Sequence, residues 1–433
     1  MNQNSKTTSV KKDGKTTLMP KLRFPEFRDA EGWESKSMSE VYAFKGHNSL
    51  SRDKLNYERG SVKNIHYGDI HTKFSTHFDI AKETVPYINQ SESLKAFEAE
   101  NFCVEGDIIF ADASEDLEDI GKAIEIVSLN GERVLSGLHT ILARQTETDL
   151  VRGFGGHLFK SKRVRTLIQK ESQGSKVLGL SGGRLAKIEI PFPSSPREQQ
   201  KIAECLSSVD EVIAAEARKL DALKTHKKGL MQELFPREGE TQPRLRFPEF
   251  QNAPEWVVKT LGKVGKNLDN RRVPITANER ESGDVPYYGA SGIVDFVKDF
   301  IFDEDLLCVS EDGANLVART YPIAFPISGK AWVNNHAHVL WFKNPCMQKF
   351  VEVYLNSINL GDFITGIAQP KLNKAMLNSI PIPHPTVPEQ QCIADGLTSL
   401  DNLLAAQTQK LEALKTHKKG LMQQLFPSPK EAV

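Results

Sequence analysis

The sequence lacks the features that mark a membrane protein or a disulfide-rich secreted protein. It has no run of about 18 apolar residues, and its polar N-terminus has no apolar segment of the signal-peptide kind. Its five cysteines are scattered without a CxxC pair, which speaks against a disulfide framework and against a zinc ribbon. We therefore expect a cytoplasmic protein with no membrane contact.

Motifs for catalysis are scarce as well. Gly14-Lys15-Thr16 lacks the upstream glycine of a Walker A phosphate loop. Gly153-Phe-Gly155-Gly156 follows no clear strand, so we interpret it as a turn and not as a cofactor loop. His66, His71 and His77 lie near one another without Cys or carboxylate partners at ligand-like spacing. We predict a chain that is not an enzyme and binds neither a metal nor a cofactor itself.

Charge of one sign is also missing. The 56 Lys and Arg residues balance the 56 Asp and Glu residues, and the formal net charge is zero. Any contact with nucleic acid must therefore use a local basic face. With 433 residues, of which 39% are hydrophobic, the chain is long enough for two or three domains with proper cores.

What the sequence does contain is a duplication. Residues Glu198–Pro236 and Glu389–Pro427 are identical at 26 of 39 aligned positions, and Pro20–Trp33 and Pro243–Trp256 are identical at 9 of 14. Each half thus opens with the same aromatic and proline-rich segment and closes with the same long segment. We expect the aromatic residues to pack against a neighbouring domain or helix end, with a ligand platform as the lesser alternative. The shared ends predict a pseudo-twofold internal repeat.

Each copy of the long segment is predicted to be one helix. Ser195-Pro-Arg-Glu198 and Thr386-Val-Pro-Glu389 have the form of a capping box, and Pro236 and Pro427 interrupt the hydrogen-bond ladder at the other end. Helices of about 37 residues span roughly 55 Å.

Seam residues recur in steps of four and three along both copies, the pattern of a coiled coil. We therefore expect the two helices to form an antiparallel pair. Glu216 and Gln407 are either tolerated polar residues at a partly wet seam or a buried pair that fixes the register. The predicted seam consists of Ile202, Leu206, Val209, Ile213, Glu216, Leu220, Leu223, Ile393, Leu397, Leu400, Leu404, Gln407, Leu411 and Leu414.

Between these shared ends the two halves differ. Short β-type runs such as Asp107–Ala111 and Asp305–Val309 alternate with turn residues, and helical stretches follow near 159–170 and 348–358. This pattern predicts an α+β domain in each half. Each insert then ends in an Ile-Pro-x-Pro run that leads into the long helix.

This layout resembles the specificity subunit of bacterial type I restriction-modification enzymes. The resemblance rests on two dissimilar inserts, each followed by Ile-Pro-x-Pro and by Glu-Gln-Gln-x-Ile-Ala, and it covers nearly the whole chain beyond the first residues. Further matching pieces are Ile65-His-Tyr-Gly-Asp-Ile70, Gly137-Leu-His139, Gly179-Leu-Ser, Tyr287-Tyr-Gly-Ala-Ser-Gly292, Glu311-Asp-Gly-Ala-Asn315, Trp332-Val-Asn-Asn-His336 and Gln369-Pro-Lys-Leu372.

The resemblance implies a DNA-specificity subunit whose two target recognition domains are separated by the antiparallel coiled coil. Each domain is expected to read one half of a bipartite, asymmetric target in double-stranded DNA, with half-sites about one turn, roughly 34 Å, apart. Two methyltransferase subunits with S-adenosylmethionine are expected to dock on the chain. Restriction subunits that use ATP and Mg²⁺ are expected to join them. The chain itself is implied to be non-catalytic.

The expected boundaries follow from this layout. A disordered basic tail covers 1–19, recognition domain 1 covers 20–194, and central helix 1 covers 195–236. A linker with the start of the repeat covers 237–256, recognition domain 2 covers 257–385, central helix 2 covers 386–427, and a short tail covers 428–433.

Candidate DNA-binding residues come from polar clusters in the two inserts. Lys and Arg neutralise phosphates, while Asn, Gln, Arg and Tyr address base edges, although a single residue of this kind is more often an ordinary surface group. The predicted residues are Lys63, His66, Tyr67, Lys176 and Arg184 in the first insert and Arg271, Arg272, Tyr288, Asn334, Asn335, Gln369 and Lys371 in the second.

Two alternatives remain beside this interpretation. A coiled-coil adaptor that binds only proteins explains the helices but not two elaborate inserts. A specificity subunit of a methylation-only system fits the sequence equally well. A stand-alone nuclease or methyltransferase is disfavoured because the carboxylate clusters and cofactor motifs are missing.

Overall fold

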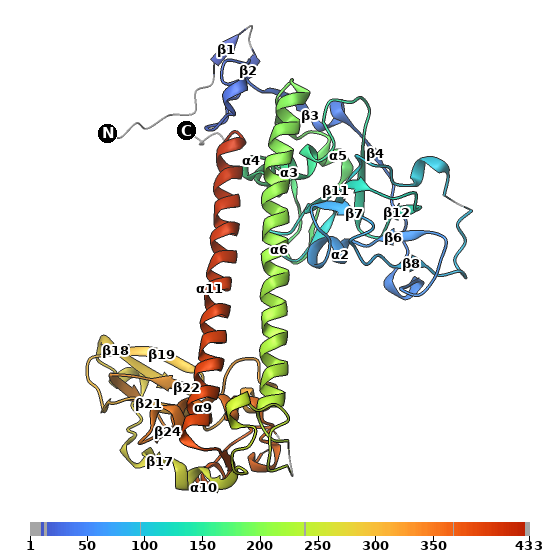
Figure 1. Cartoon of the computed structure of the whole chain (residues 1–433). Helices are drawn as coiled ribbons and strands as arrows, with labels where there is room; N and C mark the ends of the chain where they lie inside the picture. Colours follow the sequence, from blue (N-terminus) through green and yellow to red (C-terminus); the bar gives the residue numbers. More distant parts are fainter. Residues whose placement is uncertain (1–9, 13–14, 96, 238–239, 367, 429–433) are drawn as a thin grey trace. The chain divides into compact units, whose positions relative to one another are not determined.

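The computed structural model describes residues 10–12, 15–95, 97–237, 240–366 and 368–428 (Figure 1). The chain divides into two compact units, Met1–Glu216 with Lys410–Val433 and Ala217–Gln409. Each unit combines one divergent insert with parts of both long helices. None of the described helices is both long enough and apolar enough to span a membrane.

Unit 1 contains two main sheets. The first has the order β4-β13-β9-β11-β7, antiparallel except for the parallel pair of β11 and β7. The second has the order β12-β6-β8-β5, with β12 and β6 parallel. The strands are β4 (Tyr42–Lys45), β5 (Leu55–Asn56), β6 (Lys63–Ile65), β7 (His77–Asp79), β8 (Tyr87–Ile88), β9 (Ile108–Ala111), β11 (Ala123–Ser128), β12 (Val134–Ser136) and β13 (Thr140–Gln145).

Short strand pairs and helices complete unit 1. Its helices include parts of both long helices, and α3 lies beside α6 (Figure 1). The pairs are β1 (Val10–Lys12) with β2 (Lys15–Thr17), β3 (Glu34–Ser37) with β15 (Glu189–Phe192), and β10 (Ala113–Ser114) with β14 (Leu178–Gly179). The helices are α1 (Met38–Val41), α2 (Tyr67–Thr72), α3 (Phe154–Lys160), α4 (Lys162–Glu171), α5 (Gly182–Leu185), α6 (Pro196–Leu234) and α11 (Val387–Leu425).

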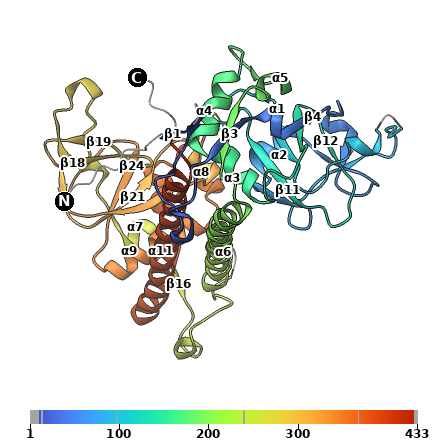
Figure 2. The same cartoon turned by 90° about the horizontal axis from the view of Figure 1, so that it is seen from above.

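Unit 2 has sheets of order β17-β24-β21-β22 and β19-β18-β23-β20. Helix α9 lies beside α11 in both Figure 1 and Figure 2. The strands are β16 (Val257–Thr260), β17 (Lys266–Asn267), β18 (Ser282–Gly289), β19 (Gly292–Val297), β20 (Phe302–Asp303), β21 (Leu306–Ser310), β22 (Ala324–Ile327), β23 (Lys330–Val333), β24 (Ala337–Trp341) and β25 (Pro381–His384). The helices are α7 (Leu261–Val264), α8 (Asn315–Ala318), α9 (Pro345–Ser357) and α10 (Lys374–Ser379).

The two inserts share one topology although their sequences differ. The order β4-β13-β9-β11 in unit 1 matches β17-β24-β21-β22 in unit 2, and the parallel pair β6 and β12 matches β18 and β23. Strand β7 has no counterpart among the described strands of unit 2. Sequence analysis identified the shared ends but not this shared topology of the inserts.

Alternation along the central strands explains the layers of each unit. Successive side chains of a strand point to opposite faces of the sheet. On β9, Ile108 and Phe110 enter the core beside the helices, whereas Ile109 enters the core beside the second sheet. On β21, Leu307 and Cys308 divide in the same way. Each main sheet is therefore covered on both faces.

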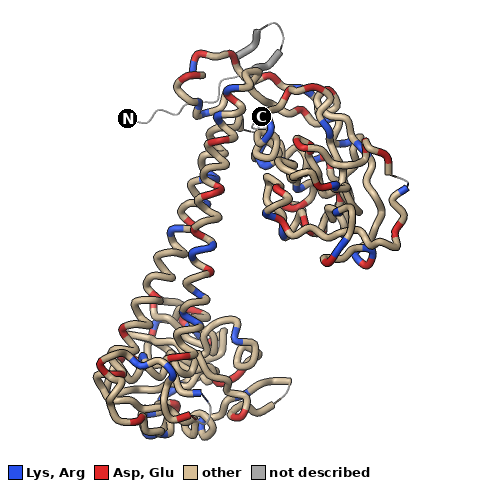
Figure 3. The backbone as a smooth tube through the Cα atoms, turned by 45° about the vertical axis from the view of Figure 1, so that its right-hand side comes forward, with Lys and Arg blue, Asp and Glu red and all other residues tan. Residues whose placement is uncertain are grey.

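The long helices are antiparallel within unit 1 and carry the same ion pair in both units. Lys410 of α11 pairs with Glu216 of α6, and Lys418 further along α11 pairs with Asp210 further back on α6. The repeat-equivalent pair in unit 2 joins Lys227 to Asp401. Basic and acidic residues are interspersed along both helices (Figure 3).

The predicted seam has the burial expected of a helix interface. Ile202, Leu206, Ile393, Leu397 and the polar Gln407 are all at least 95% buried, and none of the other predicted seam residues is exposed. The mixed helix and sheet fold with two long helices is confirmed.

A buried charged cluster closes the frame of unit 1. Glu198, 1% exposed, accepts hydrogen bonds from Nε and Nη2 of Arg23, each at 2.7 Å, and from the indole nitrogen of Trp33 at 3.2 Å. The capping-box interpretation of Glu198 missed this role. Arg23 also donates to the carbonyl oxygens of Ala30 and Glu31. The repeated aromatic segment is thereby fastened to the start of α6.

The same cluster recurs in unit 2. Arg246 donates to the Glu389 carboxylate at 2.7 and 2.8 Å, and the indole nitrogen of Trp256 donates to it at 3.1 Å. The recurrence explains why Arg, Trp and Glu are kept at matching positions of the repeat. The aromatic segments thus pack against helix ends, as expected.

The end of each long helix lies in the core of the unit in which the other long helix begins. Phe426 at the end of α11 packs edge-on against Trp33 at 5.7 Å. Phe235 at the end of α6 shares a core with Trp256 in unit 2. Each unit therefore contains the start of one long helix and the end of the other.

The structure corrects the prediction of disorder over 1–19 where it describes those residues. Strands β1 and β2 pair there, and Leu18, 7% exposed, exchanges two backbone hydrogen bonds with Trp33. An apolar leucine beside the buried indole anchors this segment. Residues 1–9, 13–14 and 429–433 lie outside the described residues. The turn interpreted at 153–156 is instead the start of α3, where Gly153 adopts φ +90°.

Candidate nucleic-acid interface

Four loops of unit 1 are held together by backbone hydrogen bonds. The amide of Asp112 donates to the carbonyl of His139 at 3.0 Å, and the amide of Leu180 donates to the carbonyl of Asp112 at 2.8 Å. The amide of Gly137 donates to the carbonyl of Ile65 at 2.8 Å. We call residues 66–68, 112–114, 137–139 and 173–180 the domain 1 loop cluster.

Unit 2 repeats these hydrogen bonds one by one. The amide of Glu311 donates to His336 at 2.9 Å, the amide of Leu372 donates to Glu311 at 2.8 Å, and the amide of Asn334 donates to Tyr288 at 3.0 Å. We call residues 289–291, 311–313, 334–336, 365–366 and 368–371 the domain 2 loop cluster. The backbone positions of the two clusters are equivalent.

Side chains at equivalent positions of the two clusters differ. The registers of the two parallel strand pairs show that Gly137 and Leu138 of domain 1 occupy the positions equivalent to Asn334 and Asn335 of domain 2. In the same way, Gly179 stands where domain 2 has Lys371. One backbone arrangement therefore presents two chemically different surfaces.

A histidine paired with an aspartate is common to both clusters. His139 Nδ1 lies 3.1 Å from Asp112 Oδ1, and His336 Nδ1 lies 2.8 Å from Asp312 Oδ2. The two imidazoles are 49% and 53% exposed. Each carboxylate holds its ring in a fixed orientation while the other ring nitrogen faces outward from the pair. Sequence analysis quoted both histidines in motifs but did not select them as binding residues.

Three imidazoles surround the ring of Tyr67 in domain 1. Tyr67 packs edge-on against His139 at 5.2 Å and against His71 at 5.9 Å, and His66 lies at 4.7 Å. Burial, followed by the charge of Arg52, lowers the pKa of His66. Nδ1 of His66 accepts the amide of Gly68 at 3.2 Å and so caps α2. Tyr67, half-buried, is thus presented on a rigid helix start.

The other predicted residues of domain 1 lie in different settings. Lys63 is 9% exposed, pairs with Glu132 at 2.9 Å and lies over the ring of Tyr87, so it makes contacts within the domain, and its contact with DNA stays a prediction. Lys176 is exposed within the loop cluster. Arg184 lies on α5 and donates to the Glu171 carbonyl.

Three predicted residues of domain 2 are exposed on its loop cluster. They are Asn335, Gln369 and Lys371. Asn334 is buried, and its side-chain oxygen accepts the amide of His336 at 2.8 Å. It therefore shapes the loop that presents its neighbours.

The remaining predicted residues of domain 2 make contacts inside the domain. Arg271 pairs with Glu304 at 2.6 Å and lies over the ring of Phe302. Arg272 pairs with Glu311 at 2.7 Å. Tyr288 stacks with Phe325 at 6.1 Å. Contact of these three residues with DNA stays a prediction.

One further polar contact of unit 2 was not found from the sequence. Tyr321, 45% exposed, shares a 2.9 Å hydrogen bond with Ser291 of the loop cluster. Ser291 was noted in the sequence, but the pattern gave no sign that Tyr321 lies beside it.

Two equivalent loop clusters on a duplicated frame define a class of protein with two related but chemically different recognition surfaces. The family model described as Type I restriction modification DNA specificity domain matches residues 30–225 and 254–416. The chain belongs to this family. Its specificity subunits are non-catalytic, and membership implies DNA binding in a complex with other subunits.

Relatives and solved structures agree with this assignment. The chain is 37% identical over 149 residues to the putative type I restriction enzyme specificity subunit S.HindORF215P of Haemophilus influenzae, a match that covers 34% of this chain and 38% of that protein. It is 26% identical to the putative MjaX specificity subunit of Methanocaldococcus jannaschii, over 92% of this chain and 93% of that protein. Its fold is similar to the S subunit from M. genitalium, with a TM-score of 0.60 and 16% identity over 95% of this chain and 100% of that one.

Proposed function

We propose that the domain 1 and domain 2 loop clusters each read one half of a bipartite, asymmetric target in double-stranded DNA. The observation that carries this proposal is the pair of equivalent backbone frameworks with different exposed side chains. Equivalent frameworks suit the same task, since both must approach a DNA groove. Different side chains suit different sequences, since base edges are distinguished by hydrogen-bonding groups.

The duplicated frame supports a symmetric set of partners. We infer that two methyltransferase subunits dock on the repeated helices and carry S-adenosylmethionine. Restriction subunits with ATP and Mg²⁺ join them. The Arg–Glu–Trp cluster and the Asp–Lys pair occur once in each unit, so a partner finds the same features twice. The five free cysteines suit a cytoplasmic complex.

The test is a comparison of methylation motifs in cells that express the chain with its methyltransferase partner. Asn335→Ala combined with Gln369→Ala removes two exposed amides from the domain 2 loop cluster. Loss of a good base contact costs about 1–3 kcal/mol of discrimination. Long-read sequencing of modified bases should show that one half of the motif becomes degenerate while the other half is unchanged.

A matched control is available in the linker. Gln251→Ala combined with Asn252→Ala removes the same two amides from exposed positions outside both clusters, and it should leave the motif intact. Degeneracy in both halves, or an unchanged motif from an intact complex carrying the cluster substitutions, would contradict the proposal for domain 2.

A further inference from the structure

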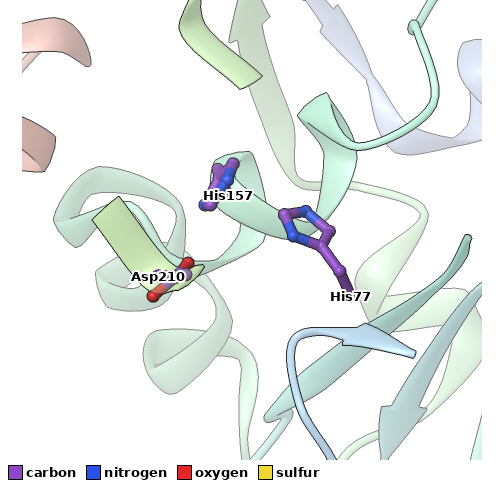
Figure 4. A group of neighbouring side chains, drawn as sticks. All are labelled: His77, His157 and Asp210. Carbon is purple, nitrogen blue, oxygen red and sulfur yellow. The ribbon is translucent and has the colours of Figure 1, made fainter. Parts of the chain in front are cut away.

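Two groups of histidine and acidic side chains lie close together among the described residues. In one group, Asp269, Glu311 and His338, both ring nitrogens of the histidine already have partners, and Arg272 pairs with both carboxylates. The other group is His77, His157 and Asp210 in unit 1 (Figure 4). Two histidines and one aspartate gathered in this way suggest a ligand.

The three side chains come from three separate elements. His77 begins β7, His157 lies on α3, and Asp210 lies on the part of α6 that belongs to unit 1. One ring nitrogen of each histidine and one carboxylate oxygen lie within 4.8 Å of one another. Ligand atoms around a tetrahedral Zn²⁺ with bonds of about 2.1 Å are about 3.4 Å apart. Small side-chain rotations close the difference.

Each imidazole has one nitrogen held by the protein. Nε2 of His77 lies 2.8 Å from the carbonyl oxygen of Gly153, and because a carbonyl only accepts, Nε2 carries the proton and Nδ1 keeps its lone pair. Nε2 of His157 lies 3.3 Å from the Ser207 hydroxyl. Metal-binding histidines are typically oriented by such a bond from the second nitrogen. A Cβ at Gly156 would lie 3.0 Å from the His77 ring, a tight contact, so glycine favours this close approach.

Burying a histidine at position 157 costs free energy if the side chain serves only for packing. Its side chain is fully buried, and its Nδ1 makes no hydrogen bond of good geometry in the described part of the chain, although the backbone of Ala203 interacts with the ring. An unsatisfied buried polar atom costs free energy. Burial, followed by the charges of His77, Lys418 and Lys160, lowers the pKa of His157 to about 2.

The other unit packs the equivalent position with an apolar residue. Phe154 on α3 meets Trp33 at 6.1 Å and 64°, and Phe350 on α9 meets Trp256 at 6.0 Å and 68°. Three residues further along these equivalent helices stand His157 in unit 1 and the buried Val353 in unit 2. The frame itself thus needs no histidine there.

The equivalent aspartates also differ in their cations. Asp401 in unit 2 is near Lys227 and near Lys349, whose ammonium is 3.7 Å away. Asp210 in unit 1 forms a salt bridge only with Lys418 among the described residues. Where unit 2 has a second ammonium ion within salt-bridge distance, unit 1 has two imidazoles, and the charge of Lys160 acts on Asp210 only from a longer distance.

We propose that His77, His157 and Asp210 bind a divalent transition-metal ion, with Zn²⁺ as the best-fitting ion. Two imidazole nitrogens and one carboxylate oxygen are a donor set that Zn²⁺ accepts, with water as a fourth ligand. The ion replaces the second cation that Lys349 provides in unit 2. It links β7, the strand that domain 1 has in addition, to α3 and to the long helix α6.

The test uses the full-length chain after removal of metal with a chelator. Titration with Co²⁺ should give one equivalent of binding with the visible absorption of a tetrahedral site, and Zn²⁺ should displace it. Zn²⁺ should also raise the midpoint of thermal unfolding. His157→Val, which copies Val353, should fold without metal and lose both effects, while His226→Ala, an exposed histidine of α6, should keep them.

Two further variants keep the proposal open to refutation. Asp210→Asn should weaken Co²⁺ binding, and Lys418→Met should strengthen it, because that ammonium lies 2.5 Å from both Asp210 oxygens and competes with the metal. Equal binding by His157→Val and the unchanged chain would reveal an adventitious ion only. That result, or no stoichiometric binding by the unchanged chain, would overturn the proposal.

Discussion

The buried cluster around Glu198 is expected to be a main determinant of the stability of unit 1. We consider Glu198→Ala. The substitution removes the carboxylate that accepts two hydrogen bonds from Arg23 and one from Trp33. The Arg23 side chain is only 7% exposed, so its guanidinium stays buried without its counter-ion.

The expected loss of stability follows from that geometry. Removing one partner of a buried ion pair destabilises a protein by about 3–5 kcal/mol, because an uncompensated charge remains in a poorly solvated place. Glu198→Gln keeps the volume but replaces one acceptor oxygen with a donor group that faces another donor. We expect it to lose one charge-assisted hydrogen bond, about 1.5–3 kcal/mol.

Urea unfolding followed by tryptophan fluorescence measures these losses, and a double-mutant cycle isolates the pair. The double variant Arg23→Ala with Glu198→Ala should be less destabilised than the sum of the two single variants, because neither partner is left buried alone. Glu389→Ala should lower the stability of unit 2 by a similar amount, since Arg246 and Trp256 bind it in the same way.

A coupling free energy below about 0.5 kcal/mol between Arg23 and Glu198 would refute this reasoning. It would mean that water or neighbouring groups compensate the guanidinium as well as the carboxylate does. Loss of stability in Glu389→Ala without loss in Glu198→Ala would show that the repeated frame is not equivalent in the two units.

Two further predictions concern His157 and the swapped helix ends. The folded-state pKa of His157 lies below its unfolded value of about 6.5, so its contribution to stability is present above that pH and declines as the pH falls. Measured with chelator present, the chain should lose about 2–3 kcal/mol relative to His157→Val between pH 7.5 and pH 4.5; parallel pH profiles would contradict the shift. A fragment of residues 1–236 should form a dimer in sedimentation experiments, because Leu234 and Phe235 can fill the place that Leu425 and Phe426 occupy in the core of unit 1. Phe235→Asp should make it a monomer, and a monomeric unsubstituted fragment would contradict the exchange.

The frame was predictable from the sequence because its determinants are local and repeated. The heptad-like spacing gave the helices, and Pro236 and Pro427 gave their ends. The role of Glu198 was not predictable, because its partner Arg23 is 175 residues away. A capping box and a buried ion pair both require a glutamate at this position, so the sequence pattern is the same for the two roles. Only the tertiary structure distinguishes them.

The loop clusters were only partly predictable for a related reason. Tyr67, Asn335 and Gln369 were selected because their types are typical of base contacts and their segments are turn-rich; they lie in the loop clusters, and their contact with DNA stays a prediction. Lys63 and Arg272 have the same types, yet both form ion pairs within their domains. The residue type indicates what a side chain can bind, whereas the tertiary fold determines which groups within the protein it contacts.

The arrangement of the loops also explains how one frame accommodates two specificities. The bonds that hold each cluster run between backbone atoms, as from Asp112 to His139 and from Glu311 to His336. Exposed side chains such as Asn335 take no part in these backbone bonds, so substitutions there change the hydrogen-bonding groups without dismantling the loops. A His–Asp pair and the backbone frame are common to both units while the neighbouring positions differ, and a chain with a repeated frame thereby has two chemically different loop clusters, as reading two different half-sites would require.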